Sequence, residues 1–187
     1  MTIKQMVDSI LLNFPGMGET QAMVELFDTE RTFIDETKCV FLWETVDIED
    51  LTETDDGYLR WEPEENMQGL LDVEYYDERG RLTDIYARIV RADGVDFIPP
   101  LPNVKRIALR YFYHPDYSDE DIKTLLTPSQ FHRGILAKIE AVHFGSLGQR
   151  FLVNQRESEY RQHVVRGIQY ANKDVNRANL TIQQHSY

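Results

Sequence analysis

The chain has 187 residues, 42% of them hydrophobic, and a formal net charge of −12 at neutral pH. This apolar content predicts a packed core and excludes wholesale disorder, and the acidic balance argues against non-specific nucleic-acid binding over the whole surface, because DNA affinity depends on Lys and Arg at the phosphates. A single cysteine, Cys39, excludes an intramolecular disulfide and a cysteine-only metal site, and its apolar neighbours predict a buried thiol.

The N-terminal region predicts two helices and no targeting segment. Apolar residues recur at three- and four-residue spacing through residues 3–14, which indicates an amphipathic helix ended by a Pro-Gly pair. A second helix is predicted for residues 20–43. The first apolar run contains an acid and is too short for a signal peptide, and no run approaches the ~20 apolar residues that span a bilayer. We therefore expect a soluble protein made in a reducing cytosol, without membrane contact.

An acidic segment and then a set of strands follow these helices. Residues 44–65 contain ten acids and one base, which predicts a solvated loop with one short strand at residues 58–61. Strand signals of period 2 begin after Gly69 and are separated by Gly-containing turns. They predict an antiparallel meander of three to five strands over residues 71–75, 85–90, 95–98 and 107–113.

The C-terminal region predicts a helical hairpin. Thr127 is placed to cap a helix, with Pro128 at its first position. A glycine-rich break at residues 145–148 ends that helix, and a second helix is predicted for residues 149–176. Residues at helical spacing are expected to lie between the two helices; they are Ile135, Leu136, Ile139, Val142, Val164, Val165 and Ile168.

These elements define an α+β chain. We predict a helical bundle of about four helices, an antiparallel β subdomain inserted into it, and an extended C-terminal tail. The expected boundaries are 1–43 for the N-terminal half of the helical body, 44–117 for the β-rich insertion with its acidic loop, 118–176 for the C-terminal half, and 177–187 for the tail.

The sequence offers few candidates for chemistry. His114 stands near Asp116, Asp119 and Asp121, but the calcium-loop pattern is absent, and a solvated turn in which Ser118 pairs with Asp121 as a helix cap explains the acids. The acids at 62, 64 and 65 fit a solvated loop. His132 and His143 share a helix face, which favours the edge of a core over a pair of ligands. Phosphate-binding and nucleophile motifs are absent. We expect no catalytic residue, cofactor or metal ion.

Charge is distributed unevenly along the chain. Residues 149–187 carry six bases and three acids, a net charge of +3, so the first 148 residues carry −15. Oppositely charged ends favour head-to-tail contacts between copies, or contacts with different neighbours above and below. Ordinary Arg/Glu patterning on a solvated helix is the alternative.

The tail at residues 177–187 has too few apolar residues to order itself. Leu180 and Ile182 are two apart, so an extended chain points them the same way, as anchors of an added strand would be. Arg177 adds a charge contact at the start of the tail, and Tyr187 ends it. We predict that these four residues dock on a partner; a frayed terminus is the alternative.

The run from Ile107 to Tyr187 resembles the C-terminal half of head-to-tail adaptor proteins of tailed bacteriophages. The resemblance consists of the strand IALRYFY followed by His114 and Pro115, a short polar turn, a helix opening with TPSQFH, a long helix rich in Arg, Glu and Tyr, and a polar tail. The N-terminal helix pair is compatible with the other half of that family. The acidic stretch 44–65 matches nothing in it.

The resemblance implies a structural, non-enzymatic virion protein of the neck, assembled in the host cytoplasm. Family members form a homo-oligomeric ring, typically of twelve copies, whose helical bodies pack side by side around a DNA channel. The tail would dock on the portal protein and the β insertion would face tail or nozzle proteins. Acidic walls suit a channel through which DNA must slide.

Two alternatives stay open. One is another phage neck or tail-completion ring protein, with the same assembly logic at a different position. The other is a small metal-dependent hydrolase that uses carboxylates at Glu62, Glu64 and Glu65, or His114 with Asp116.

Overall fold

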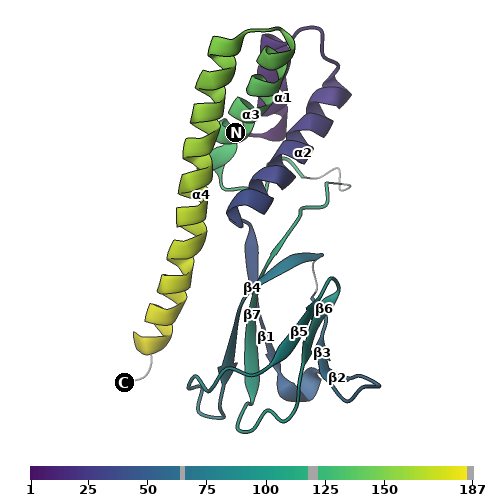
Figure 1. The fold of residues 1–187 in the computed structure, drawn as a ribbon, viewed down its shortest axis with the longest axis vertical. Coiled ribbons are helices and arrows are strands. Elements are labelled where there is room, and N and C mark those ends of the chain that lie inside the picture. Colours follow the sequence, from purple (N-terminus) through teal and green to yellow (C-terminus); the bar gives the residue numbers. More distant parts are fainter. Residues whose placement is uncertain (64–65, 118–121, 185–187) are drawn as a thin grey trace. The chain divides into compact units, whose positions relative to one another are not determined.

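The computed structural model describes residues 1–63, 66–117 and 122–184, with side chains as far as Asn172. It divides into a helical unit, Met1–Val40 with Pro115–Tyr187, and a β unit, Phe41–His114 (Figure 1). Four α-helices and two antiparallel sheets in the described residues confirm the predicted α+β class. Each boundary of the β unit lies three residues before the position expected from the sequence.

The helical unit is built around a helix that contacts the other three. This central helix is α3, and α1, α2 and α4 all pack on it. Thr2 caps the first helix reciprocally with Gln5, and a 3-10 turn, Ser129–Phe131, precedes the third. The helices are α1 (Ile3–Asn13), α2 (Glu19–Thr37), α3 (His132–Ser146) and α4 (Arg150–Gln184).

Helix α2 ends six residues earlier than predicted. Lys38 adopts a left-handed conformation with φ of 56°, and its N–H bonds to the Ile34 carbonyl at 2.7 Å, which closes the helix. The apolar run that follows enters a strand instead, since short runs of this kind fit either element. Cys39 is 4% exposed, as expected, and burial raises the pKa of its thiol to about 11.

The β unit holds two sheets, with strand orders β1-β7-β4 and β2-β3-β6-β5. Their inner faces share a core around Tyr75, Phe97 and Tyr111. Gly94 is required where β6 passes close to the neighbouring strand β3, because a Cβ at Gly94 would lie 2.3 Å from the Trp61 carbonyl oxygen. The strands are β1 (Phe41–Asp47), β2 (Thr52–Glu53), β3 (Leu59–Trp61), β4 (Met67–Tyr76), β5 (Arg88–Arg91), β6 (Gly94–Phe97) and β7 (Arg106–Tyr113).

Two predictions for this unit are wrong. The acidic stretch 44–65 is not mainly loop, because β1, the 3-10 turn Ile48–Asp50, β2 and β3 occupy much of it. The strands do not form a meander either, since β4 pairs with β7 and not with the next strand along the chain. Both errors have one cause: β1 and β4 find their partner in β7, far away in the sequence, and local patterns carry no information on such pairing.

The C-terminal hairpin is present with corrections at its ends. Thr127 makes no side-chain cap, and α3 begins only at His132. Gly148, with φ of 70°, marks the break. Helix α4 continues to Gln184, so the backbone of residues 177–184 is helical where an extended tail was expected; neither Gly nor Pro follows residue 167 to stop it. The role of Ser118 and Asp121 as a cap lies outside the described residues.

The predicted interface between α3 and α4 is half right. Ile135, Leu136 and Ile139 are buried, but Val142, Val165 and Ile168 are 60%, 54% and 41% exposed. The face of α4 that contacts the other helices consists of different α4 residues, which are Tyr160, His163, Gly167 and Ala171. Gly167 leaves room for the Thr37 side chain of α2, and the Tyr160 ring lies edge-on to the Phe33 ring. Helix α4 therefore packs through small and aromatic residues, and Val165 stays exposed.

Candidate functional site

The predicted docking residues fall at the end of α4. Arg177, Leu180 and Ile182 lie on its last turns, where side chains are not described, and Tyr187 lies outside the described residues. Their role therefore stays a prediction. The extended backbone on which the pairing of Leu180 with Ile182 depended is not the backbone found there.

The structure describes only part of the residues considered for chemistry. Glu62 is an exposed residue of the β unit, and Glu64 and Glu65 lie outside the described residues. Of the three acids considered with His114, Asp116 is exposed, and Asp119 and Asp121 lie outside the described residues. In the part of the chain that the structure describes, no group of three His, Cys, Asp or Glu side chains is placed to hold a metal ion.

Both histidines of α3 take part in packing the helical unit. His132 is buried, its Nε2 lies 2.8 Å from the Thr127 carbonyl oxygen, and burial lowers its pKa. His143 pairs with Glu25 of α2 at 2.5 Å, and its ring lies 4.7 Å from that of Phe14. These contacts agree with a place at the edge of a core and join α3 to α1 and α2.

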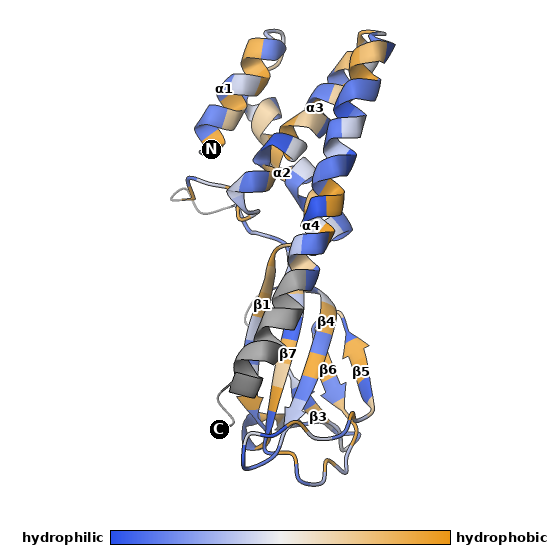
Figure 2. Ribbon diagram, turned by 90° about the vertical axis from the view of Figure 1, so that its left-hand side faces the viewer, coloured by the Kyte–Doolittle hydropathy of each residue, from blue (hydrophilic) through white to orange (hydrophobic). Residues whose placement is uncertain are grey.

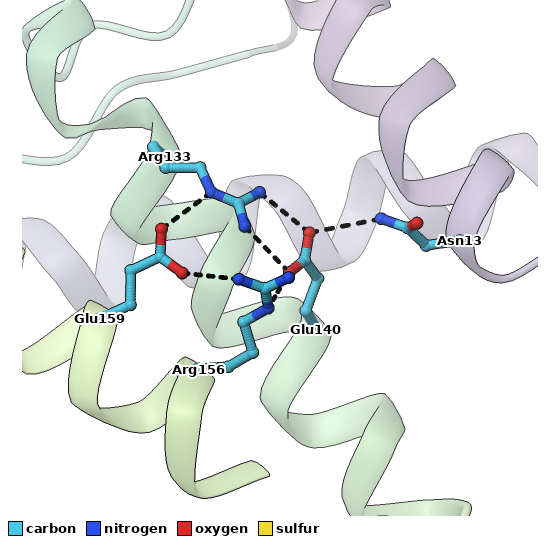
Figure 3. Close-up of polar contacts among 5 residues, drawn as sticks. All are labelled: Asn13, Arg133, Glu140, Arg156 and Glu159. Atoms are coloured by element: carbon cyan, nitrogen blue, oxygen red, sulfur yellow. Dashed lines mark hydrogen bonds and ion pairs between the residues drawn. The ribbon is translucent and has the colours of Figure 1, made fainter. Parts of the chain in front are cut away.

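Helix α4 is fixed to α3 by a closed group of two arginines and two glutamates (Figure 3). Arg133 bonds to both oxygens of Glu140, at 3.0 and 3.3 Å, and to Glu159 at 2.9 Å. Arg156 completes the group, with an ion pair of 2.6 Å to Glu140 and a hydrogen bond of 2.8 Å to Glu159. Asn13 of α1 also donates to Glu140. This group therefore ties three helices together.

The electrostatics of this group follow from its alternating charges. Burial opposes ionisation of Arg133, but the carboxylates of Glu159 and Glu140 outweigh it and raise the Arg133 pKa. Burial likewise opposes ionisation of Glu159, and the hydrogen bonds from Arg133 and Arg156 hold its pKa below the usual value. The alternating contacts of the two arginines and two glutamates fix the register of α4 on α3.

The opposite face of α4 is open. We call it the α4 outer face; it contains a shallow groove of about 650 Å³. The acids of the described part of α4 are used internally, since Glu157 pairs with Lys138 and Glu159 belongs to the group above. The outer face consists of Phe151, Asn154, Ser158, Arg161, Gln162, Val165, Arg166, Ile168 and Gln169, with Arg150 at its start. Glu157 also lines the groove, but it is half-buried and paired with Lys138, so the exposed charges of this face are basic.

The exposed side of α2 has the opposite sign. We call it the α2 outer face; it comprises Glu19, Met23, Val24, Asp28, Arg31 and Asp35, whereas Glu36 lies against Tyr160 of α4. The one base of this face, Arg31, lies 3.7 Å from Asp28. In the view of Figure 1, α4 lies to the left of the helical unit and α2 to the right, and the two helices contact each other at Phe33 and Tyr160. Figure 2 shows hydrophobic and hydrophilic residues interspersed along both. The unit thus carries an acidic face and a basic face, each with apolar residues.

Sequence reasoning found only part of this arrangement. The charge difference between the first 148 residues and the rest was visible, but its position on two helix faces was not. The exposure of Val165 and Ile168 was missed because both fit the apolar spacing of α4. The signal that could have revealed the acidic face is the composition of α2, with six acids and one base.

Comparison with known proteins adds no relative. No family model matches the sequence, and no curated protein does so either. Among the helices in the described residues, none has the length and apolar content needed to cross a membrane.

Proposed function

We propose that this protein is a structural component of a virion neck, a head-to-tail adaptor of a tailed bacteriophage that forms a ring on the portal protein. The observation that carries the proposal is the pair of outer faces on α2 and α4, which have opposite charge within one helical unit. Two different, complementary faces on one chain favour heterologous contacts, and such contacts generate a ring when the rotation between copies closes.

The rigidity of α4 supports an assembly role. The Arg133–Glu140–Arg156–Glu159 group and the buried aromatic contacts hold α4 in one register on α3. A surface held in this way is already ordered before it binds, so little conformational entropy is lost on association.

The acidic balance supports passage of DNA through the ring. With a net charge of −12 per chain, a ring of about twelve copies would line its channel with a repulsive potential for phosphates. DNA would then move through the channel without being retained. In this proposal the β unit faces tail or nozzle proteins, and the protein is part of the virion after assembly in the host cytoplasm.

The end of α4 is proposed as the portal contact. Residues 177–187, with Arg177, Leu180, Ile182 and Tyr187, follow the part of α4 that is fixed on α3. A helix lying in a groove of a neighbouring protein is a common mode of recognition.

The test measures binding to isolated portal rings of the same virus. We expect the full chain to bind as a ring whose copy number is read by native mass spectrometry or cryo-electron microscopy, and a chain shortened by residues 177–187 to lose that binding while melting at nearly the same temperature. Binding of the full chain to tail proteins but not to the portal would identify another neck or tail-completion ring protein. Absence of any ring would refute the proposal.

A further inference from the structure

We infer that the α4 outer face of one copy binds the α2 outer face of the next copy. The inference deepens the proposed function, because it rests on ring formation and names the two surfaces that form it. It does not depend on the portal.

The first argument is charge complementarity. The exposed charges on the described part of α4 are Arg150, Arg161 and Arg166, without an exposed acid. The exposed charges on the α2 outer face are three acids and Arg31, which already lies against Asp28. Copies that met through two α4 faces would bring bases together, and copies that met through two α2 faces would bring acids together. Pairing α4 with α2 is the arrangement in which opposite charges meet.

The second argument is that each face also carries exposed apolar side chains. Phe151 is 80% exposed and Val165 54% exposed on α4, and Val24 is 53% exposed on α2. Apolar groups rimmed by charges are typical of a protein–protein interface. A nucleic acid would use the arginines of α4 but would leave Phe151 and Val165 without an apolar partner.

The third argument is the height of each residue along the helices. Within one copy, Phe33 of α2 contacts Tyr160 of α4, and Thr37 meets Gly167 farther along, so the two helices run in the same direction. Both rise about 1.5 Å per residue. Counting back to Val24 from the Phe33–Tyr160 contact reaches Phe151, and counting back from the Thr37–Gly167 contact reaches Asn154, so Val24 lies level with the first turns of α4.

The same counting places the charged residues together. Asp35 lies between the levels of the two contacts, as do Arg161 and Arg166 on α4. In a ring whose axis runs along the helices, rotation from copy to copy keeps each residue at its own height. Phe151 of one copy then meets Val24 of the next, and the two arginines meet the acidic end of the neighbouring α2.

The experiment uses two variants that exchange charge. The acidic variant carries Arg161→Glu and Arg166→Glu, and the basic variant carries Asp28→Arg and Asp35→Arg. In the first variant both outer faces are acidic, and in the second both are basic, so each alone should elute as a monomer. Mixed in equal amounts, they place an acidic face against a basic face at every contact, and assemblies of wild-type mass should return.

A matched control changes charge elsewhere. Arg79→Glu with Lys123→Glu alters the net charge as much as the acidic variant does, at exposed positions outside both outer faces. This control should assemble like the wild type. Thermal melting of all three variants should stay close to wild type, because the substituted residues are exposed.

A covalent test checks the predicted heights. A chain with both Val24→Cys and Phe151→Cys should form a ladder of disulfide-linked oligomers on oxidation, with little background because Cys39 is buried. Pairing Val24→Cys with Val142→Cys, which is equally exposed but on α3, should not form one.

Several results would overturn the inference. They are a wild-type chain that stays monomeric at the highest attainable concentration, charge variants that assemble alone, a mixture that does not assemble, or an acidic variant that loses only nucleic-acid binding. Portal binding is measured separately. Rings that form through these faces without binding portals would leave this inference intact and refute the adaptor role.

Discussion

Gly134 of α3 and His163 of α4 lie so close that the glycine has no room for a side chain. A Cβ added at Gly134 would lie 2.5 Å from the Cβ of His163, which is fixed to the backbone of α4 and cannot move away by rotating. The two helices approach each other closely at this contact, which explains a glycine at the third position of α3 (His132–Ser146).

Gly134→Ala should therefore destabilise the protein. In an open helical position this change stabilises by roughly 0.5–1 kcal/mol, whereas here we expect a loss of about 1–3 kcal/mol from overpacking. Gly145→Ala is the control, since it lies on the same helix and its Cβ would make only an ordinary contact, 3.9 Å from Val153. Urea unfolding should show opposite signs for the two variants, and equal signs would disprove the close approach.

Two aliphatic residues one turn apart on α3 should differ in their effect on stability. Ile139 is 2% exposed and Val142 is 60% exposed. We expect Ile139→Ala to cost about 2–5 kcal/mol, as buried truncations do, and Val142→Ala to cost less than about 0.5 kcal/mol. The free energies of unfolding from denaturant titrations measure both. A comparable loss in the two variants would mean that Val142 is also covered.

Removal of the carboxylate of Glu140 should weaken the attachment of α4. The Glu140 side chain is 4% exposed and lies between Arg133 and Arg156, so Glu140→Ala leaves two arginines facing each other. Breaking a buried pair in this way costs about 3–5 kcal/mol. The exposed pair of Asp28 and Arg31 is the control, and Asp28→Ala should change stability by less than about 1 kcal/mol.

Hydrogen exchange provides an independent measurement of how Glu140→Ala affects the attachment of α4. Amides of α4 around Arg156 should exchange faster in Glu140→Ala than in wild type, while those of the β unit should not change. Unchanged exchange in α4 would show that the group does not hold this helix.

A buried carboxyl on α2 predicts a dependence of stability on pH. Glu30 is fully buried, accepts a 2.8 Å hydrogen bond from the Thr127 N–H and bonds to the Tyr117 hydroxyl. Burial raises its pKa from 4.5 to about 7, although the bonds from Thr127 oppose the rise. The folded chain thus holds this proton more tightly than the unfolded chain. The contribution to stability is fully present below about pH 4.5 and is lost as the pH rises through about 7.

Glu30→Gln should remove this dependence. Between about pH 5 and about pH 8 the wild type should lose up to about 3 kcal/mol more than the variant, the limit set by 1.4 kcal/mol per pKa unit. The other titrating groups are the same in both proteins, so their contributions to the pH dependence of stability cancel in the difference. Parallel stability curves for the two proteins would show that Glu30 titrates as an ordinary exposed carboxyl.

The sequence by itself determined the class and the helices of this protein. Spacings of three and four residues identified α1 and the face of α3 with Ile135 and Ile139, because a helix returns its side chains to one side every 3.6 residues. The change to period 2 located β4 and β7. These are local properties, fixed by neighbours a few residues away. The charge difference between the two parts of the chain was also visible at this level.

Only the tertiary structure decided which chain segments pair and which apolar residues stay outside. The run from Phe41 becomes a strand because β7, more than 60 residues away, offers it an edge. Val165 and Ile168 stay exposed because α4 turns its glycine and aromatic positions toward α3 and α2. In each case the deciding partner is distant in sequence, and the energy of close packing overrides a local pattern that fits two outcomes equally well.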